Sequence, residues 1–311
     1  MRKIFDAIQS YARESDMLLF AVSLICSIYG VVLVASASRV YDGAHVTIQL
    51  LAIVIGVVAY IITSLVDVDI LADKYKLLFV AGLLFIATLF IWGREDDTGN
   101  RAWLRFFGIG VQPAELVRIP YIIIIARMIA VQRDARALNA VGTMLRIVGI
   151  FAAYFALLLV SSRDLGSALV YAFVLSAMMF VGGVYMRWFV LAGAAIAAAA
   201  PFIKRYFLTE RQWLRILVVF DPSADPTGRE TMWQANQSKL AISSGRFFGQ
   251  GLFKGRMTQS DLIPQQHTDF IFSAAGEELG FVGCAAIILL LAVLVGRCLY
   301  VGVKSNSRLG L

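Results

Sequence analysis

Residues 263–283, IPQQHTDFIFSAAGEELGFVG, begin as a polar loop and pass directly into an apolar run that still carries Asp269, Glu277 and Glu278. An apolar run of about twenty residues can cross a bilayer as a helix. Asp269 falls at the start of this run, whereas Glu277 and Glu278 lie about 12–14 Å deeper along a helix. A charged side chain at mid-membrane costs about 2.5–3.5 kcal/mol. The stretch therefore predicts a membrane span with a polar site at its beginning and two carboxyl groups that need partners or a water-filled cavity.

The composition extends this prediction to the whole chain. Hydrophobic residues make up 59% of the 311 residues and charged residues only 16%, whereas soluble domains have about 25% charged residues. We therefore expect an all-α, polytopic transmembrane helix bundle. The net charge of +7 fits the excess of Lys and Arg in cytoplasmic loops of membrane proteins. The basic residues form no block with interleaved aromatics, which argues against a nucleic-acid partner.

The apolar runs predict about eight spans in a single integral membrane domain, residues 1–311. The expected spans are roughly residues 17–37, 46–66, 77–93, 111–131, 146–162, 165–186, 188–203 and 268–296. A long segment, about 204–267, separates the seventh span from the eighth. The three cysteines lie in or beside apolar runs without metal-ligand spacing, and two histidines are too few to suggest a metal cluster.

The distribution of Lys and Arg over the short loops predicts the orientation. If the N-terminus is cytoplasmic, the cytoplasmic segments contain more Lys and Arg than the short outer segments, as is usual for membrane proteins. Both termini are therefore expected inside, and the 204–267 segment is expected outside. That segment is basic and contains SSGRFFGQGLFKGR, residues 243–256. Backbone N–H groups and guanidinium groups bind phosphate well, so the segment suits an anionic headgroup; attraction to an anionic lipid surface is the simpler alternative.

Two further polar clusters are expected on the outer side. GNRAWLRFFGIGVQPAELVRI, residues 99–119, precedes the fourth span, with Pro113 suited to a first helical turn. Glu115 and Arg118 are three residues apart and can pair on one helical face. SSRDLGSA, residues 161–168, places Asp164 between the fifth and sixth spans. Together with the Asp269 stretch, these clusters outline a polar site that opens outward above apolar spans.

Simpler interpretations of the carboxyl groups stay open on spacing alone. Asp269 suits the cap of a helix, because Asp and Thr are favoured at helix starts. Glu277 and Glu278 suit pairing with an Arg on another span, which would fix the geometry of the bundle. Carboxyl groups within spans would also suit a transporter.

Residues 233–283, WQANQSKLAISSGRFFGQGLFKGRMTQSDLIPQQHTDFIFSAAGEELGFVG, closely resemble the signature region of the SEDS family, the RodA/FtsW/SpoVE proteins. GNRAWLRFFGIGVQPAEL and RDLGSA resemble the family's other two extracytoplasmic motifs in order and spacing. The resemblance covers nearly the whole chain. It implies a peptidoglycan glycosyltransferase that polymerises lipid II at the outer face of the bacterial cytoplasmic membrane and works with a class B penicillin-binding protein.

The resemblance also implies the site. Asp269 matches the aspartate regarded as essential in the family's HTDF motif, and it is the candidate base or, alternatively, a ligand for a divalent cation such as Mg or Mn. No other cofactor is implied. The matching substrate-binding candidates are Arg101, Trp103, Gln112, Glu115, Asp164, Gln234, Gln237, Ser238, Lys239, Arg246, Lys254, His267 and Thr268. Glu277 and Glu278 match the GEELG element and are expected to be structural residues within the membrane.

The chain departs from the family pattern at several points. Gln265 stands where a Glu is frequent, Arg163 where a Pro is usual, and Arg246 where a second Gly is common. The family has ten spans and eight are expected here, so either the sequence is shortened or the last two spans are missing. The element QSKLAISSG is closer to the elongation-type, RodA-like members.

Two alternatives to the polymerase come from other functional classes. One is a flippase for lipid-linked precursors that uses the same outward site. The other is a non-catalytic membrane scaffold for a penicillin-binding protein. Under the polymerase hypothesis the products are a glycan strand, made during cell elongation or division, and polyprenyl pyrophosphate.

Overall fold

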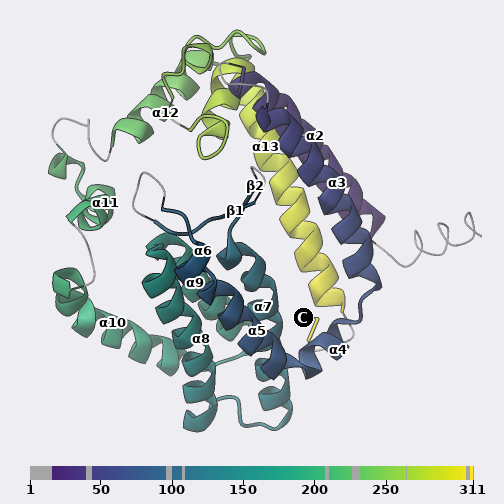
Figure 1. Ribbon diagram of the computed structural model, residues 1–311, viewed down its shortest axis with the longest axis vertical. Helices are drawn as coiled ribbons and strands as arrows, with labels where there is room; N and C mark the ends of the chain where they lie inside the picture. Colours follow the sequence, from purple (N-terminus) through teal and green to yellow (C-terminus); the bar gives the residue numbers. More distant parts are fainter. Residues whose placement is uncertain are drawn as a thin grey trace, which may run out of the picture. The chain divides into compact units, whose positions relative to one another are not determined.

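The computed structural model describes residues 16–39, 44–95, 100–106, 109–206, 210–225, 232–263, 265–305 and 309–310. In this part of the chain helices predominate, and the only strands form one short hairpin (Figure 1). β1 (Leu104–Phe106) pairs antiparallel with β2 (Ile109–Val111), with Leu104 opposite Val111. The prediction of an all-α, polytopic membrane bundle is confirmed.

Every predicted span coincides with a helix or a helix pair. The helices are α2 (Met17–Ala37), α3 (Ala44–Leu65), α4 (Val68–Asp73), α5 (Tyr75–Ala87), α6 (Leu89–Trp92), α7 (Pro113–Asp134), α8 (Val141–Ser162), α9 (Leu165–Gly182), α10 (Met186–Tyr206), α11 (Glu210–Phe220), α12 (Trp233–Gly245) and α13 (Ile271–Lys304). Six helical segments of the described chain are long and apolar enough to cross a membrane, and Met186–Phe202 is a shorter apolar helix. α7 is long enough as well, but it carries Glu115, Arg118, Arg127 and Arg133.

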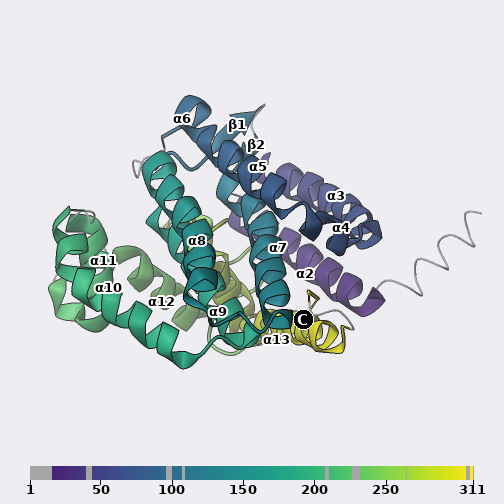
Figure 2. The same cartoon turned by 90° about the horizontal axis from the view of Figure 1, so that it is seen from below.

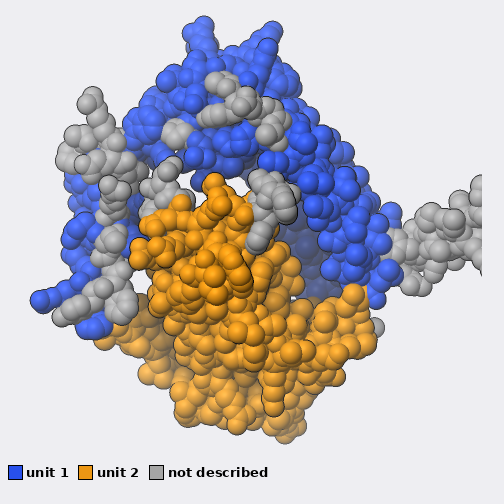
Figure 3. All heavy atoms as spheres, viewed as in Figure 1, with its two compact units in different colours: residues 1–65, 201–305 blue, residues 66–200, 306–311 orange. Residues whose placement is uncertain are grey.

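The chain divides into two compact units, coloured separately in Figure 3. The first unit comprises residues 1–65 and 201–305, and the second comprises residues 66–200 and 306–311. A single domain over residues 1–311 stays a prediction. The predicted loop 204–267 belongs to the first unit, where it contains α11, α12 and two 3₁₀ turns, η1 (Pro222–Ala224) and η2 (Thr258–Ser260).

In the second unit, α5, α7, α8 and α9 pack around three buried tyrosines. The rings of Tyr121, Tyr154 and Tyr171 lie 4.7–6.0 Å apart, and all three side chains are fully buried. The Tyr171 hydroxyl donates to the carbonyl of Ala114 at 2.7 Å, and the Tyr154 hydroxyl donates to that of Phe79 at 3.3 Å. Each ring thus contributes apolar area while its hydroxyl group finds an acceptor.

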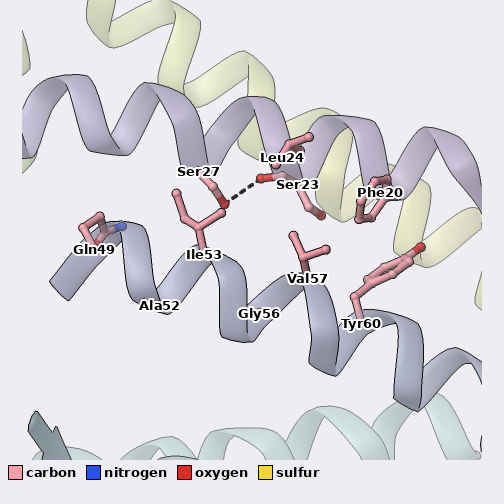
Figure 4. A pocket seen from close by; sticks show the side chains of 10 residues that line it. All are labelled: Phe20, Ser23, Leu24, Ser27, Gln49, Ala52, Ile53, Gly56, Val57 and Tyr60. Carbon is pink, nitrogen blue, oxygen red and sulfur yellow. Dashed lines mark hydrogen bonds between the residues drawn. The ribbon is translucent and has the colours of Figure 1, made fainter. Parts of the chain in front are cut away.

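In the first unit, α2 lies alongside both α3 and α13 (Figures 1 and 2). Asp16 begins α2: its carboxylate accepts from the Leu19 N–H at 3.0 Å and forms an ion pair of 2.8 Å with Arg297 of α13. α2 and α3 line an open pocket of about 270 Å³, whose walls include the polar side chains of Ser23, Ser27, Gln49 and Tyr60 among apolar ones (Figure 4).

α13 is interrupted at Gly280, whose φ of 65° and ψ of −158° are not helical. A break inside a span leaves backbone groups that lipid cannot satisfy. Residues 246–251 supply the missing partners. The N–H groups of Gln250 and Gly251 donate to the carbonyls of Glu277 and Glu278, each at 2.9 Å. The carbonyls of Arg246 and Phe247 accept from the N–H groups of Phe281 and Val282 at 2.9 and 3.2 Å. This inserted loop therefore replaces one turn of the helical ladder.

Candidate functional site

α12 and the first half of α13 pack closely because small residues meet at their contact. A Cβ atom on Gly245 would lie 1.9 Å from the carbonyl oxygen of Gly276, and one on Gly276 would lie 2.9 Å from the side chain of Ile242. Small residues allow such close approach of helices in a membrane. Beside this contact, the hydroxyl groups of Ser238 and Ser273 share a hydrogen bond of 2.6 Å. The predicted site residues of α12 are thereby fixed to the helix that follows Asp269.

Glu277 and Glu278 are both buried, with exposed fractions of 0 and 1%. Glu277 accepts from the N–H groups of Met257 and Thr258 at 2.8 and 2.9 Å and from the Thr258 hydroxyl at 2.7 Å. Within the described residues neither carboxyl group forms an ion pair. The expectation of an Arg partner on another span is therefore wrong, because main-chain N–H groups and hydroxyls take its place.

Glu278 accepts four hydrogen bonds. One oxygen accepts from the Ser36 hydroxyl at 2.5 Å and from the Phe253 N–H at 3.1 Å. The other accepts from the Gly255 N–H at 3.3 Å and from the Gln259 amide at 2.9 Å. A Cβ on Gly255 would lie 2.8 Å from both glutamate side chains, so only glycine allows this approach. We call the set that holds residues 253–259 against α2 and α13 the buried polar network: Ser36, Thr258, Gln259, Gln266, Glu277 and Glu278.

Asp269 lies in a turn of residues 265–270 that directly precedes α13, and its side chain is exposed. The turn is closed by N–H groups of Thr268 and Phe270 that donate to the Gln265 carbonyl at 3.1 and 3.2 Å. The cap of α13 is Phe270, and no side chain bonds to the first turn. The alternative interpretation of Asp269 as a helix cap is therefore wrong. Within the described residues its carboxylate makes no hydrogen bond or ion pair, so it is accessible to a ligand.

His267 lies two residues before Asp269 and contacts a residue from the start of the chain. Its ring centroid is 4.2 Å from that of His45, in the first turn of α3. Burial and, to a smaller extent, the neighbouring His45 lower the pKa of His267, while Asp261 and Asp269 act in the opposite direction. The imidazole beside Asp269 is therefore biased toward its neutral form.

The cationic candidates of the first unit, Lys239, Arg246 and Lys254, are all exposed. Arg246 ends α12 with φ 53° and ψ −135°, a conformation that favours glycine. This is the position at which the family resemblance leads one to expect a glycine. Gln234 is exposed and Gln237 half-buried on α12. The exposed side chains among them are accessible to an anionic headgroup. No contact in the described part of the chain indicates which of them binds it.

The second unit brings Gln112 and Asp164 together. Asp164 caps α9: one carboxylate oxygen accepts from the Ser167 N–H at 3.1 Å, and the other accepts from the Ser167 hydroxyl at 2.6 Å. The Gln112 amide, at the start of α7, donates to Asp164 and to the Ser167 hydroxyl, each at 3.1 Å. The two motifs QPAE and RDLGSA thus meet through Gln112 and Asp164.

The remaining candidates of the second unit lie nearby in the chain. Glu115 pairs with Arg118 at 2.8 Å, as the three-residue spacing predicts. Arg101 donates its N–H to the carbonyl of Ser162 at 2.9 Å, and its guanidinium lies 3.4 Å from Glu95. Trp103 packs over Gly110 of the hairpin and keeps 38% of its surface exposed.

Sequence analysis missed several residues of these clusters. Ser36, Gln259, Gln266 and His45 contact the predicted motifs in the first unit, and Ser167 and Glu95 do so in the second. The signal for Ser36 is a polar residue next to the end of an apolar run, which is too common to be distinctive. Residues 99, 107 and 108 of the predicted cluster 99–119 lie outside the described residues.

Comparison with known proteins places the chain in a family. The model of the FtsW/RodA/SpoVE family, described as "Cell cycle protein", matches residues 16–311. The chain belongs to this family. It is 32% identical over 306 residues to the "Probable peptidoglycan glycosyltransferase FtsW" of Trichlorobacter lovleyi, covering 96% of this chain and 78% of the relative.

Two solved structures share the fold. One comes from work on "Structural coordination of polymerization and crosslinking by a peptidoglycan synthase complex", with a TM-score of 0.75, 25% identity, and coverage of 95% of this chain and 80% of that one. The other is the rod shape determining protein RodA of Thermus thermophilus, with a TM-score of 0.65, 23% identity, and coverage of 95% and 78%. The chain is accordingly a multi-pass membrane protein of this family.

The family resemblance implies a divalent cation, which would need a cluster of ligand side chains. Within the described residues no group of three or more His, Cys, Asp or Glu side chains is arranged to hold a metal ion. Asp269 is exposed in its turn and, within the described residues, belongs to no such group. The described side chains therefore form no three-ligand site for Mg or Mn, and assistance by a divalent cation stays a prediction.

Proposed function

We propose that this chain is a peptidoglycan glycosyltransferase that polymerises lipid II into glycan strands at the outer face of the bacterial cytoplasmic membrane. The observation that carries the proposal is the accessible carboxylate of Asp269 in a turn fixed at the head of α13. Family membership supports the same reaction, because the matched relative is named for it.

The reaction joins two lipid-linked disaccharides. The 4-hydroxyl of GlcNAc on one attacks C1 of MurNAc on the other. A new C1–O bond forms, the bond between C1 and the pyrophosphate oxygen breaks, and polyprenyl pyrophosphate leaves. Asp269 accepts the proton of the attacking hydroxyl as general base, a role that requires a carboxylate within hydrogen-bonding reach of the substrate.

Cationic side chains stabilise the pyrophosphate group as negative charge develops on it. Arg246, Lys254 and Lys239 are exposed in the unit that carries Asp269. Arg101 is a further candidate from the second unit. We assign Gln112, Glu115 and Asp164 to substrate positioning, because hydrogen bonds and an ion pair already fix their side chains.

The proposal includes a topology and a partner. With both termini of the chain in the cytoplasm, α12 and the start of α13 face outward, where the lipid-linked substrate is displayed. A class B penicillin-binding protein would then cross-link the strands that this chain makes. The structural likeness to a chain from a peptidoglycan synthase complex supports such a partner.

The decisive experiment incubates purified protein with lipid II, with and without a class B penicillin-binding protein, and separates the products on a gel. Asp269→Asn is expected to abolish glycan strands while the protein stays folded. Asp261→Asn, the same change at another exposed position of this loop, is the matched control and is expected to stay active.

Other outcomes separate the alternatives. Strand formation by Asp269→Asn would contradict the assigned base. Movement of labelled lipid II across liposomes without polymer would indicate a flippase. A folded protein that does neither, yet binds and activates the penicillin-binding protein, would be a scaffold.

A further inference from the structure

The 265–270 turn has few local contacts to fix it. It has no side-chain cap, and its internal hydrogen bonds all run to Gln265: main-chain N–H groups donate to the Gln265 carbonyl, and the Thr268 hydroxyl lies 3.3 and 3.4 Å from the Gln265 carbonyl and side-chain oxygens. Gln265 itself adopts a left-handed conformation with φ 51°. Thr268 and Asp269 are exposed, so neither anchors the turn to the interior. The position of the Asp269 carboxylate must therefore be set by tertiary contacts of the remaining residues.

Gln266 provides the first of these contacts. Its side chain is fully buried, and its amide nitrogen donates to two main-chain carbonyls: Ala37 at the end of α2, at 2.9 Å, and Thr258 of η2, at 2.8 Å. Two acceptors facing one nitrogen require a group with two N–H donors, which among uncharged side chains only an amide supplies. The Gln266 oxygen is buried without a hydrogen-bond partner within the described residues. An orphaned buried acceptor costs free energy, which is consistent with a residue retained for its two donors.

One acceptor residue, Thr258, belongs to the buried polar network, and the other, Ala37, directly follows a member of it. Thr258 is fixed by Glu277 through its N–H and its hydroxyl. Ala37 follows Ser36, which donates to Glu278 at 2.5 Å. Gln266 therefore links the turn that carries Asp269 to two carboxyl groups of α13 and to the end of α2.

The second contact is the pair of rings formed by His267 and His45 at 4.2 Å. It connects the same turn to the start of α3. Ala37 and His45 lie at the two ends of the connection between α2 and α3, so both contacts attach the turn to the same helical hairpin.

We propose that Gln266 is a positioning residue of the glycosyltransferase site, and that its carboxamide, together with the His45–His267 ring pair, fixes Asp269 on the α2–α3 hairpin. This inference rests on the proposed function and deepens it. Gln266 acts through Asp269 and does not touch substrate. Loss of its donors is expected to lower kcat about 100-fold, the effect of misplacing a reacting group by about 1 Å, with a much smaller change in KM for lipid II.

The test compares the same substitution at two adjacent positions. Gln266→Glu removes both donors with little change of shape, whereas Gln265→Glu makes the identical change on an exposed side chain. Gln266→Met also removes both donors but adds no charge. It replaces Gln266→Glu in the test if the glutamate variant fails to fold. We expect reduced kcat in both Gln266 variants and wild-type kinetics in Gln265→Glu.

A spectroscopic measurement follows the turn independently of activity. The chain contains two histidines, so protein with labelled histidine and a histidine-free tag gives only two imidazole signals, and these belong to the ring pair. His45→Phe assigns them. The Gln266 variants are expected to shift the His267 signal, and Gln265→Glu is expected to leave it in place.

Three outcomes would overturn the inference: Gln266 variants with the kinetics of Gln265→Glu, an unmoved His267 signal, or a loss of activity fully explained by loss of folded protein. Inactive wild-type protein would instead contradict the proposed function. In that case the histidine signals would still decide whether Gln266 fixes the turn.

Discussion

Glu278→Gln probes the buried polar network with a change of a single atom. The carboxyl group of Glu278 accepts two hydrogen bonds on each oxygen, from Ser36 and Phe253 on one and from Gly255 and Gln259 on the other. An amide keeps one oxygen and turns two N–H bonds toward the remaining two donors. The substitution therefore loses acceptors without creating a cavity.

The magnitude follows from the better of the two amide orientations. With the amide nitrogen toward Ser36, the hydroxyl can rotate and accept. The Phe253 N–H loses its bond to Glu278 but keeps a bond of 3.2 Å to the Ser36 hydroxyl oxygen. Hydrogen bonds to a charged group contribute about 1.5–3 kcal/mol and those to a neutral group about 0.5–1.5 kcal/mol. We therefore expect a loss of about 1–3 kcal/mol in the free energy of unfolding.

The assay is thermal unfolding of the purified protein in nanodiscs, followed by tryptophan fluorescence. For a chain of this size the loss corresponds to a fall in Tm of about 2–5 °C. The control is Glu115→Gln, which breaks a half-exposed ion pair worth at most about 1 kcal/mol. Equal Tm values for the two variants would refute the claim that Glu278 holds residues 253–259 against α13.

Three further predictions concern other contacts. Arg246→Gly should raise the free energy of unfolding by about 1 kcal/mol, because glycine adopts φ 53° without strain; an unchanged denaturation midpoint would contradict this. Gly276→Ala should lower Tm more than Gly296→Ala in the same helix, since a Cβ meets α12 at the first position and has open space at the second. The N–H of Leu19 and the nearby Arg297 lower the pKa of Asp16. Its contribution to stability should thus be present above the unfolded pKa of about 3.9 and be lost as the pH falls through the folded pKa. Asp16→Asn should therefore flatten acid unfolding curves, and a curve identical to wild type would count against the ion pair.

The membrane helices could be predicted from sequence because an apolar run of about twenty residues rarely forms anything other than a transmembrane helix. Local rules also succeeded where both partners lie within one turn, as with Pro113 at the start of α7 and the pair Glu115–Arg118. The meeting of Gln112 with Asp164 was implied only by the order of two motifs, since their separation of 52 residues leaves no local pattern.

The surroundings of Glu277 and Glu278 could not be predicted. Every residue except proline carries an N–H group, so a loop that supplies main-chain donors has no side-chain signature. The break at Gly280 depends on the same loop, because the main-chain groups of residues 246–251 form the hydrogen bonds that the interrupted helix lacks. The capping hypothesis for Asp269 failed for a related reason: contacts of Gln266 and His267 with α2 and α3, far away in sequence, shape the turn.

The hydrogen bond between Ser36 and Glu278 joins residues 242 positions apart and has a consequence for biosynthesis. Ribosomes add about 5–20 residues per second, so the first hairpin waits roughly 12–50 s in the membrane before its partner is made. Residues 66–200, a continuous segment, can pack during that interval. The unit that carries Asp269 can thus be completed only after α13 has been made, and a nascent chain stalled before α13 cannot complete the buried polar network.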